Sequence, residues 1–500
     1  MQFNSFDYMF FFPIVVVVFF LIPKKLRSLW LLAASYYFYM SWNAKYALLI
    51  GASTIITYFA GILIEGAQEG EERAKTNIRK TVVVLAILIN LSILAIFKYG
   101  NFALKTVGDI GRHFNLFYFD KRLDILLPVG ISFYTFQALG YVIDVYRGDI
   151  RAEHNPVRYA LFVSFFPQLV AGPIERSHNL LKQIGGIEGF RLYNAKRVTS
   201  GAVLMVWGLF LKMVIADRIS IPVDMVFDNF RRYGSTELIF AAAGFSIQIY
   251  CDFASYSMLA IGSAKILGFE LMENFNTPYF SESIKEFWER WHISLTTWLR
   301  DYLYIPLGGN RRGKIRKYIN IMLVFLASGL WHGANWTYVF WGGLHGLFRV
   351  AGEWSQDLRR GLIKKFGIRS DCFSYHFLKV FITFCLTVFA WIFFRAPSIT
   401  DALAIVKRIF LKPTPWVMFN GGLYELGLNR TEMNILFISL VVLLLVSLVR
   451  RFRGQTVDVF LMGQNLWFEW AVIIVLVMAV FVYGEYGPAF DARQFIYFQF

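Results

Sequence analysis

The chain has 500 residues, of which 57% are hydrophobic and 17% are charged, whereas about a quarter of the residues are charged in an average soluble protein. It carries 50 Lys and Arg against 34 Asp and Glu, a net charge of +16. Nucleic-acid binding would need a basic soluble module, and none is visible, so that class of function is excluded. The cysteines Cys251, Cys372 and Cys385 lack CxxC or zinc spacing, so we expect neither a disulfide framework nor a metal site.

Apolar runs recur along the whole chain. Several reach the roughly 17–25 residues that a spanning helix needs, and others are shorter. The runs lie at 9–23, 28–42, 82–97, 125–143, 198–215, 236–250, 318–331, 336–349, 377–394, 434–449 and 466–483. A buried core helix of a soluble protein can explain one short run but not so many. We predict an all-α polytopic membrane bundle of about ten to twelve spans, with re-entrant and interfacial helices around a central funnel, in a single domain over 1–500.

The charges around the first apolar run predict its orientation. No Lys or Arg precedes it, whereas Lys24, Lys25 and Arg27 follow it. A secretory signal peptide has its positive charges first. We therefore expect an uncleaved first helix with the N-terminus outside and residues 24–27 in the cytoplasm. The net positive charge fits the same bias of cytoplasmic loops and contact with the anionic lipids of the cell membrane.

The stretch 281–302 has the most regular pattern in the chain. Apolar side chains recur every three or four positions and charged ones take the other side, which predicts an amphipathic helix too polar to span. His292 belongs to the apolar face, so we expect it to point into the protein body. It is a candidate proton shuttle, or a core histidine held by one hydrogen bond. The apolar positions are Ile284, Phe287, Trp288, Trp291, Leu295, Trp298, Leu299 and Tyr302.

A basic turn follows this stretch. Pro306 stops the helix, and Gly308-Gly309-Asn310 predicts a turn. Eight Lys or Arg lie between 285 and 317 against three acids, and eight minus three leaves a net +5. These charges either set the topology and contact lipid, or attract a phosphate-bearing donor or an acidic carrier protein. The candidate residues for the second role are Arg311, Arg312 and Lys314.

His332 lies where the next apolar helix is interrupted. From Lys317 to Trp331 the helix rises about 22 Å of a hydrocarbon core of about 30 Å, so His332 would lie past the midplane. Gly333-Ala334-Asn335 then breaks the pattern. An ionisable side chain at such a break lines a cavity or does chemistry, unless its role is structural. His345 would lie about 220° further round a continuous helix, so we expect it to face elsewhere with a structural role.

Asp252 is a lone acid between two apolar runs. It can orient a histidine or hydrogen-bond hydroxyls of an acceptor, and it can equally be a paired structural acid. Two turns marked by Gly and Pro, at 127–130 and 171–173, punctuate the helices. The polar positions near them are Gln137, Asp144, Gln168 and Glu175.

Taken together, these motifs resemble the membrane-bound O-acyltransferase (MBOAT) family, in the bacterial branch that includes the membrane subunit of alginate O-acetyltransferase and, more distantly, the D-alanyl transfer protein of teichoic acid synthesis. The resemblance covers nearly the whole chain, with a motif core at about 160–350. The segments that carry it are Phe166–Ile174, Tyr250–Phe253, Phe287–His292, Arg300–Asn310, Trp331–Trp336 and Phe495–Phe500.

The resemblance implies that His332, in the Trp-His-Gly motif, is the central catalytic residue and that His292 is the second family histidine. It implies an acyl group, most simply acetyl, taken from a cytoplasmic thioester such as acetyl-CoA, with no tightly bound cofactor. The acceptor would be hydroxyls of a cell-surface polysaccharide, alginate-like or other. Transfer would be direct or through an extracytoplasmic esterase-like partner, and an acyl carrier protein could present the donor. The lining candidates are Asp252, Trp288, Trp291, Trp331, Asn335, Trp336 and Tyr302.

The chemistry of the residues agrees, because a neutral histidine can take the proton of an attacking hydroxyl in a site shielded from water. D-alanyl transfer to teichoic acid is an alternative with the same chemistry. A proton-coupled transporter or flippase should show repeated halves with matching broken helices, and the sequence shows none. A lipid-carrier glycosyltransferase with an acid in a long first external loop is disfavoured, because that loop is only about Trp42–Lys45. GxSxG, HExxH and P-loop motifs are absent.

Overall fold

The computed structural model describes residues 1–67, 72–116, 123, 128–190, 194–486 and 496, without the side chains of 72–75. The beginning of the predicted run 125–143 and the motif Phe495–Phe500, apart from Ile496, lie outside the described residues. Helices and the segments between them make up the described part of the chain, with one isolated antiparallel bridge between Phe275 and Trp291. The predicted all-α membrane class is confirmed.

Seven helical segments among the described residues are long and apolar enough to cross a membrane. Helix α1 (Phe6–Leu21) is apolar but shorter, and α14 (Lys314–His332) and α15 (Trp336–Trp354) are outside this set. The total of ten to twelve spans, like the funnel, stays a prediction. The seven segments are Tyr46–Gly66, Thr76–His113, Ala195–Asp228, Ser235–Leu267, Phe373–Arg395, Arg430–Arg453 and Leu466–Tyr483.

The chain forms two compact units, so the single domain expected over 1–500 stays a prediction. The first unit consists of Met1–Ala202 and Leu259–Met272. In it α3 packs on α6 so closely that a Cβ on Gly61 would meet the ring of Tyr141. Besides α1, its helices are α2 (Arg27–Met40), α3 (Tyr46–Gly66), α4 (Glu72–Leu94), α5 (Gly100–His113), α6 (Ile131–Arg147), α7 (Pro156–Ser164), α8 (Lys182–Gly185) and the beginning of α9 (Ala195–Leu209).

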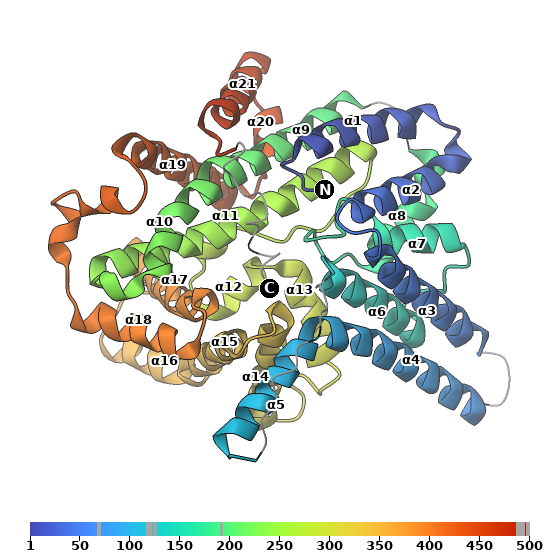
Figure 1. The fold of residues 1–500 in the computed structure, drawn as a ribbon, viewed down its shortest axis with the longest axis horizontal. Coiled ribbons are helices and arrows are strands. Elements are labelled where there is room, and N and C mark those ends of the chain that lie inside the picture. The colour runs from blue at the N-terminus through green and yellow to red at the C-terminus, as the bar shows by residue number, and fades with distance from the viewer. Residues whose placement is uncertain (68–71, 117–122, 124–127, 191–193, 487–495, 497–500) are drawn as a thin grey trace. The chain divides into compact units, whose positions relative to one another are not determined.

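The second unit consists of Val203–Met258 and Glu273–Phe500 and contains both histidines singled out in the sequence. Its helices α14 and α15 run side by side (Figure 1) as a tight antiparallel pair. Small residues allow this approach, since a Cβ on Gly329 or Gly342 would meet backbone carbonyls of the other helix. Its remaining helices are α10 (Asp217–Asp228), α11 (Ser235–Leu267, as far as Met258), α12 (Ile284–Arg290), α13 (Ile293–Leu299), α16 (Gln356–Lys365), α17 (Phe373–Arg395), α18 (Ile399–Leu411), α19 (Arg430–Arg453), α20 (Val457–Met462) and α21 (Leu466–Tyr483).

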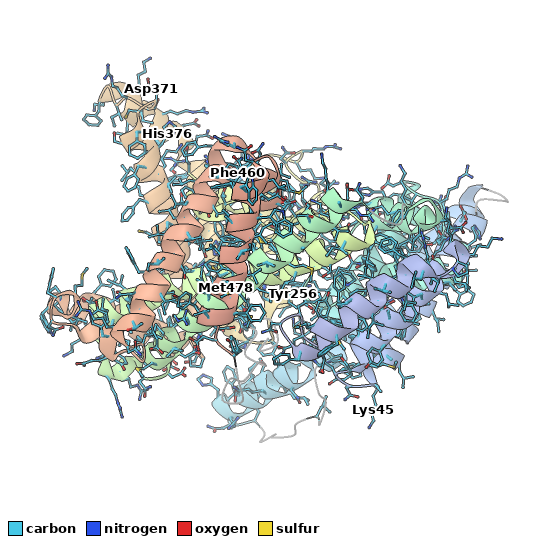
Figure 2. The ribbon with its side chains drawn as sticks, turned by 90° about the horizontal axis from the view of Figure 1, so that it is seen from above. Lys45, Tyr256, Asp371, His376, Phe460 and Met478 are labelled. Carbon is cyan, nitrogen blue, oxygen red and sulfur yellow. The ribbon has the colours of Figure 1, made fainter. Side chains whose placement is uncertain are left out.

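Ion pairs gather the helix ends of the second unit at two ends. We call the first the basic end, because Lys and Arg side chains gather there in the turn 311–317, in helix α16 and in the segment 450–453. Asp371 and His376, at the beginning of α17, also lie at this end (Figure 2). Its ion pairs are Lys317–Glu353, His376–Glu282, Lys379–Glu282 and Arg450–Glu273. The opposite end has Arg395–Asp224 and Arg395–Asp228, together with the backbone bond from Ser235 to Lys412.

Candidate active site

His292 is placed by a break in the chain that the sequence did not predict. The single amphipathic helix expected over 281–302 is wrong, because the chain forms α12 and α13 with His292 between them in the left-handed region, at φ 44°. The cause is a non-local pairing, in which the amide of Asn276 donates to Arg290 and that of Ile293 donates to Asn274, both at 3.0 Å. Backbone in this region costs a non-glycine residue about 1–3 kcal/mol, so its neighbours must hold it there.

A buried polar network holds this break. The hydroxyl of Ser294 donates to Oδ1 of Asn274 at 2.6 Å, and Nδ2 of Asn274 donates to the hydroxyl of Ser257 on α11 at 2.9 Å. All three residues are buried. The network therefore ties the beginning of α13, and His292 with it, to α11. Nothing in the sequence pattern identified Asn274, because its partners lie 17 and 20 positions away.

His332 is the last residue of α14, where the predicted interruption is confirmed. Gly333 is extended, and α15 begins at Trp336 with the side chain of Asn335 accepting from the amide of Thr337 at 3.1 Å. A Cβ on Gly333 would meet the ring of Tyr338, so the turn needs glycine there. The interruption ends the helix at the imidazole of His332 itself.

The fold brings the two histidines together within an aromatic cluster. Both are buried, and their ring centroids are 6.3 Å apart. His292 lies edge-on to Phe253 at 4.6 Å, and His332 lies edge-on to Trp341 at 5.1 Å and 5.6 Å from Phe394. Burial lowers the pKa of the His292 imidazole to about 3, because desolvation penalises the charged form. Two buried histidines in aromatic surroundings suit a pair of roles, in which one imidazole accepts a proton from a hydroxyl and the other polarises a carbonyl.

His345 does not face away from this cluster, which corrects the expectation from the helical angle. The ring of Trp341 contacts both histidines, with its centroid 5.0 Å from that of His345 and 5.1 Å from that of His332. The angle did not apply because the break at 333–335 interrupts the helix between them. Nδ1 of His345 accepts from the indole N–H of Trp288 at 3.2 Å, which supports the expected structural role.

The other predicted lining residues divide into two groups. Trp288, Trp291 and Trp331 are buried in the cluster; Trp331 lies 5.8 Å from His292, and Trp291 stacks on Phe287. The structure does not bring the rest to the histidines. Trp336 is half exposed, Tyr302 packs on Trp298, and Asn335 caps α15. Arg311, Arg312 and Lys314 are exposed at the basic end.

Asp252 is a paired acid. One carboxylate oxygen contacts Nζ of Lys212 at 2.7 Å, and the other accepts from the amide of Ile496 at 2.9 Å. The same Lys212 lies 2.7 Å from Asp217, and all three charged side chains are buried. Of the two readings that the sequence left open, this geometry favours the structural one.

The polar positions near the Gly/Pro turns belong to the first unit. Nε2 of Gln168 donates to Gln137 at 3.0 Å, and the hydroxyl of Ser177 donates to Asp144 at 2.6 Å. Glu175 accepts from the amide of Met272, and burial raises its pKa to about 7. Across the described residues no group of three or more His, Cys, Asp or Glu is arranged to hold a metal ion.

Two pockets of the second unit are lined by residues close in sequence to the histidines. One, of about 210 Å³, is at the basic end and includes Arg290, two residues before His292. The other, of about 190 Å³, is at the opposite end and includes Asn335, three residues after His332. The first is lined by Glu273, Asn276, Arg290, Arg450, Arg451, Gly454 and Thr456. The second is lined by Asp224, Phe245, Gln248, Asn335, Thr337, Tyr338, Phe394, Arg395, Ala396, Pro397 and Ile496.

Most of these pocket residues were missed by the sequence reasoning. Arg450 and Arg451 follow the apolar run 434–449, and Gln248 and Phe394 lie within the runs 236–250 and 377–394. A polar amide within a spanning run, as at Gln248, was the one signal that could have been used.

Comparison with known proteins adds an independent line of evidence. Residues 149–396 match the family described as MBOAT, membrane-bound O-acyltransferase family. The chain is 37% identical over 461 residues to the "probable alginate O-acetylase AlgI" of Pseudomonas aeruginosa, covering 91% of this chain and 83% of that protein. It is 35% identical over 418 residues to the peptidoglycan O-acetyltransferase of Helicobacter pylori, covering 77% and 73%. Similarity to the teichoic acid D-alanyltransferase of Bacillus subtilis is 29% over 226 residues, covering 43% and 56%.

Proposed function

Because this chain belongs to the membrane-bound O-acyltransferase family, we propose that it moves an acetyl group from a cytoplasmic thioester to hydroxyls of an exported polysaccharide. The O-acyltransferase activity follows from the family. The donor, the acceptor and the direction across the membrane are the proposed part. The names of two relatives support the acceptor, since one is described as an alginate O-acetylase and the other as a peptidoglycan O-acetyltransferase.

The observation that carries the proposal is the buried histidine pair with a pocket towards each end of the second unit. A hydroxyl oxygen of the acceptor attacks the thioester carbonyl carbon while neutral His332 takes its proton. The carbon–sulfur bond then breaks, and the leaving thiolate regains a proton from the imidazolium. His292 orients the donor or polarises its carbonyl. The surrounding indoles and phenyl rings keep water from competing for the acyl group.

The basic end is suited to the donor. Arg290, Arg450 and Arg451 line its pocket, and the acids beside them are Glu273 and Glu286. Three guanidinium groups against two carboxylates leave an excess of one positive charge for a phosphate-bearing thioester such as acetyl-CoA. The positive-inside rule assigns this end to the cytoplasm, where such thioesters are made. The turn with Arg311 and Arg312 adds long-range attraction for the same donor or for an acyl carrier protein.

The opposite end then serves the acceptor. An acetyl group leaving there reaches the glycan directly or through an extracytoplasmic esterase-like partner. D-alanyl transfer to teichoic acid remains the second candidate, supported by a similarity that covers 43% of this chain.

The test uses purified protein in liposomes with acetyl-CoA labelled in the acetyl group. Alginate, peptidoglycan fragments and a neutral glucan are offered as separate acceptors. We expect base-labile label in at least one glycan with the wild type and a loss of about 100-fold or more with His332→Ala. Transfer by His332→Ala at the wild-type rate would contradict the catalytic role of His332. Transfer from D-alanyl carrier protein but not from acetyl-CoA would favour the second candidate.

A further inference from the structure

One residue that lines the pocket at the opposite end has a buried hydrogen-bond acceptor without a partner among the described residues. Gln248, on α11, lines the pocket and is 7% exposed, and its amide oxygen Oε1 has no hydrogen-bond partner among the described residues. A buried polar atom left without a partner costs about 1–3 kcal/mol. An unpartnered acceptor on a residue that lines a pocket is explained if a bound ligand supplies the donor.

The pocket adjoins the proposed reaction centre through one side chain. Phe394 lines the pocket and also packs on the imidazole of His332, with ring centroids 5.6 Å apart. Tyr338 packs edge-on to Phe394 with ring centroids 4.9 Å apart, and the ring centroid of Phe245 lies 6.4 Å from that of Phe394. The lining therefore combines three aromatic rings with five polar or charged side chains, those of Asp224, Gln248, Asn335, Thr337 and Arg395. Polar groups of this kind can fix the orientation of a small molecule.

We propose that this pocket binds one sugar residue of the acceptor glycan, with Gln248 accepting a hydrogen bond from a ring hydroxyl. The inference rests on the proposed function. The reacting hydroxyl must give its proton to His332, so it is not the group that satisfies Gln248. The acceptor consequently needs a second hydroxyl near the first. A sugar ring has neighbouring hydroxyls for the polar side chains of the pocket, and its apolar C–H face can lie on one of the three aromatic rings. A serine side chain has one hydroxyl and no such face.

The charges at the pocket indicate recognition through hydroxyls instead of a sugar carboxylate. Arg395 is the lining residue that could pair with a carboxylate, but its guanidinium already contacts Asp224 at 2.6 Å and Asp228 at 3.3 Å. Two carboxylates against one guanidinium leave a net negative charge. A uronate carboxyl therefore gains nothing here, and an uncharged ring is accepted at least as well.

The decisive variant is Gln248→Met, which keeps the length of the side chain but has only a weak acceptor. Ser246→Ala on the same helix is the matched control, because its hydroxyl donates to Ala242 and the residue does not line the pocket. We expect Gln248→Met to raise KM for a glycan oligosaccharide about tenfold, the loss of one hydrogen bond. KM for acetyl-CoA and the slow hydrolysis of acetyl-CoA without glycan should not change, and Ser246→Ala should match the wild type.

Two further acceptors test whether the pocket recognises ring hydroxyls, a sugar carboxylate or a single hydroxyl. A mannuronate oligosaccharide is compared with its carboxyl-reduced, uncharged counterpart, and a serine peptide serves as an acceptor with one hydroxyl. The proposal is supported if the wild type acetylates the carboxyl-reduced oligosaccharide at the same rate as the charged one and if Gln248→Met does not change the acetylation rate of the serine peptide. The proposal is overturned if the wild type does not acetylate the carboxyl-reduced oligosaccharide, or if Gln248→Met leaves KM for the glycan unchanged. If the wild type acetylates no glycan at all, the proposed function itself fails.

A measurement that leaves Gln248 intact guards against misfolding of that variant. Pro397 lines the same pocket and is exposed. A cysteine at this position, with Cys372 and Cys385 replaced by serine, is alkylated with and without the uncharged oligosaccharide. We expect the saccharide to slow alkylation at 397, and an unchanged rate at saturating saccharide would contradict a sugar-binding pocket.

Discussion

The network around Asn274 offers the sharpest test of how the chain positions His292. Asn274→Ala removes the hydrogen bonds to Ser294 and Ser257 but leaves the backbone bond from Ile293 to the Asn274 carbonyl. Leaving two buried hydroxyls without these bonds should cost about 2–4 kcal/mol of stability. The beginning of α13 then relaxes from its left-handed residue, and a displacement of about 1 Å at a reacting group costs about 100-fold in rate.

The assay is steady-state acetyl transfer from acetyl-CoA by the purified variant, with the melting temperature measured in the same detergent. We expect kcat to fall about 100-fold, with KM for acetyl-CoA little changed, because the donor pocket at Arg290 keeps its residues. Ser257→Ala is the matched control. It removes the bond farther from His292 and should lower stability with only a small effect on kcat. If Asn274→Ala is destabilised but keeps kcat within a few fold of the wild type, the network does not position His292.

The remaining predictions address the second histidine, the helix pair and the pH dependence. His292→Ala should lower turnover more than His345→Ala at matched expression, because the ring of His292 lies 6.3 Å from that of His332, whereas His345 accepts a structural hydrogen bond from Trp288. If His345→Ala lowers turnover more, His345 and not His292 is the second catalytic histidine. Gly342→Ala should reduce both stability and activity by forcing apart α14 and α15, whereas Gly343→Ala, with only Leu326 at 3.6 Å from its added Cβ, should be tolerated; equal thermal melting of the two would refute the close-packing argument. Burial raises the pKa of Glu175 from 4.5 to about 7, so stability should fall as pH rises from about 4.5 to about 7, by at most about 3 kcal/mol. Glu175→Gln should flatten that slope in detergent melts, and an unchanged slope would exclude this carboxyl as its cause.

Local sequence patterns were sufficient to predict the class of fold and the helix break at His332. A long apolar run that ends at His-Gly-Ala-Asn predicts a helix break from local signals alone, and the boundaries of α14 and α15 confirm the break. Its depth in the membrane stays a prediction. The helical period also identified the buried face of 284–299. It could not show that α12 and α13 are separate, because the break at His292 depends on pairing with 274–276.

The pockets depend on residues that only the fold brings together. Gln248 comes from α11, Phe394 from the end of α17 and Arg450 from the end of α19. The periodicity of each helix says which side chains are buried but not which helix they face. The same limit left two readings of Asp252 open until Lys212, 40 positions away, was seen beside it.

The central claim is that acetyl passes from a donor at the basic end to an acceptor at the opposite end. The most direct measurement places the Arg312→Cys variant, with Cys372 and Cys385 replaced by serine, in sealed liposomes. An impermeant thiol reagent then selects the orientation in which position 312 is outside. Labelled acetyl-CoA is added outside, and the acceptor oligosaccharide is enclosed inside. The account predicts that acetylated oligosaccharide accumulates inside, and that none forms when donor and acceptor exchange places. Product formed only when both are on one side of the membrane would contradict transfer across it.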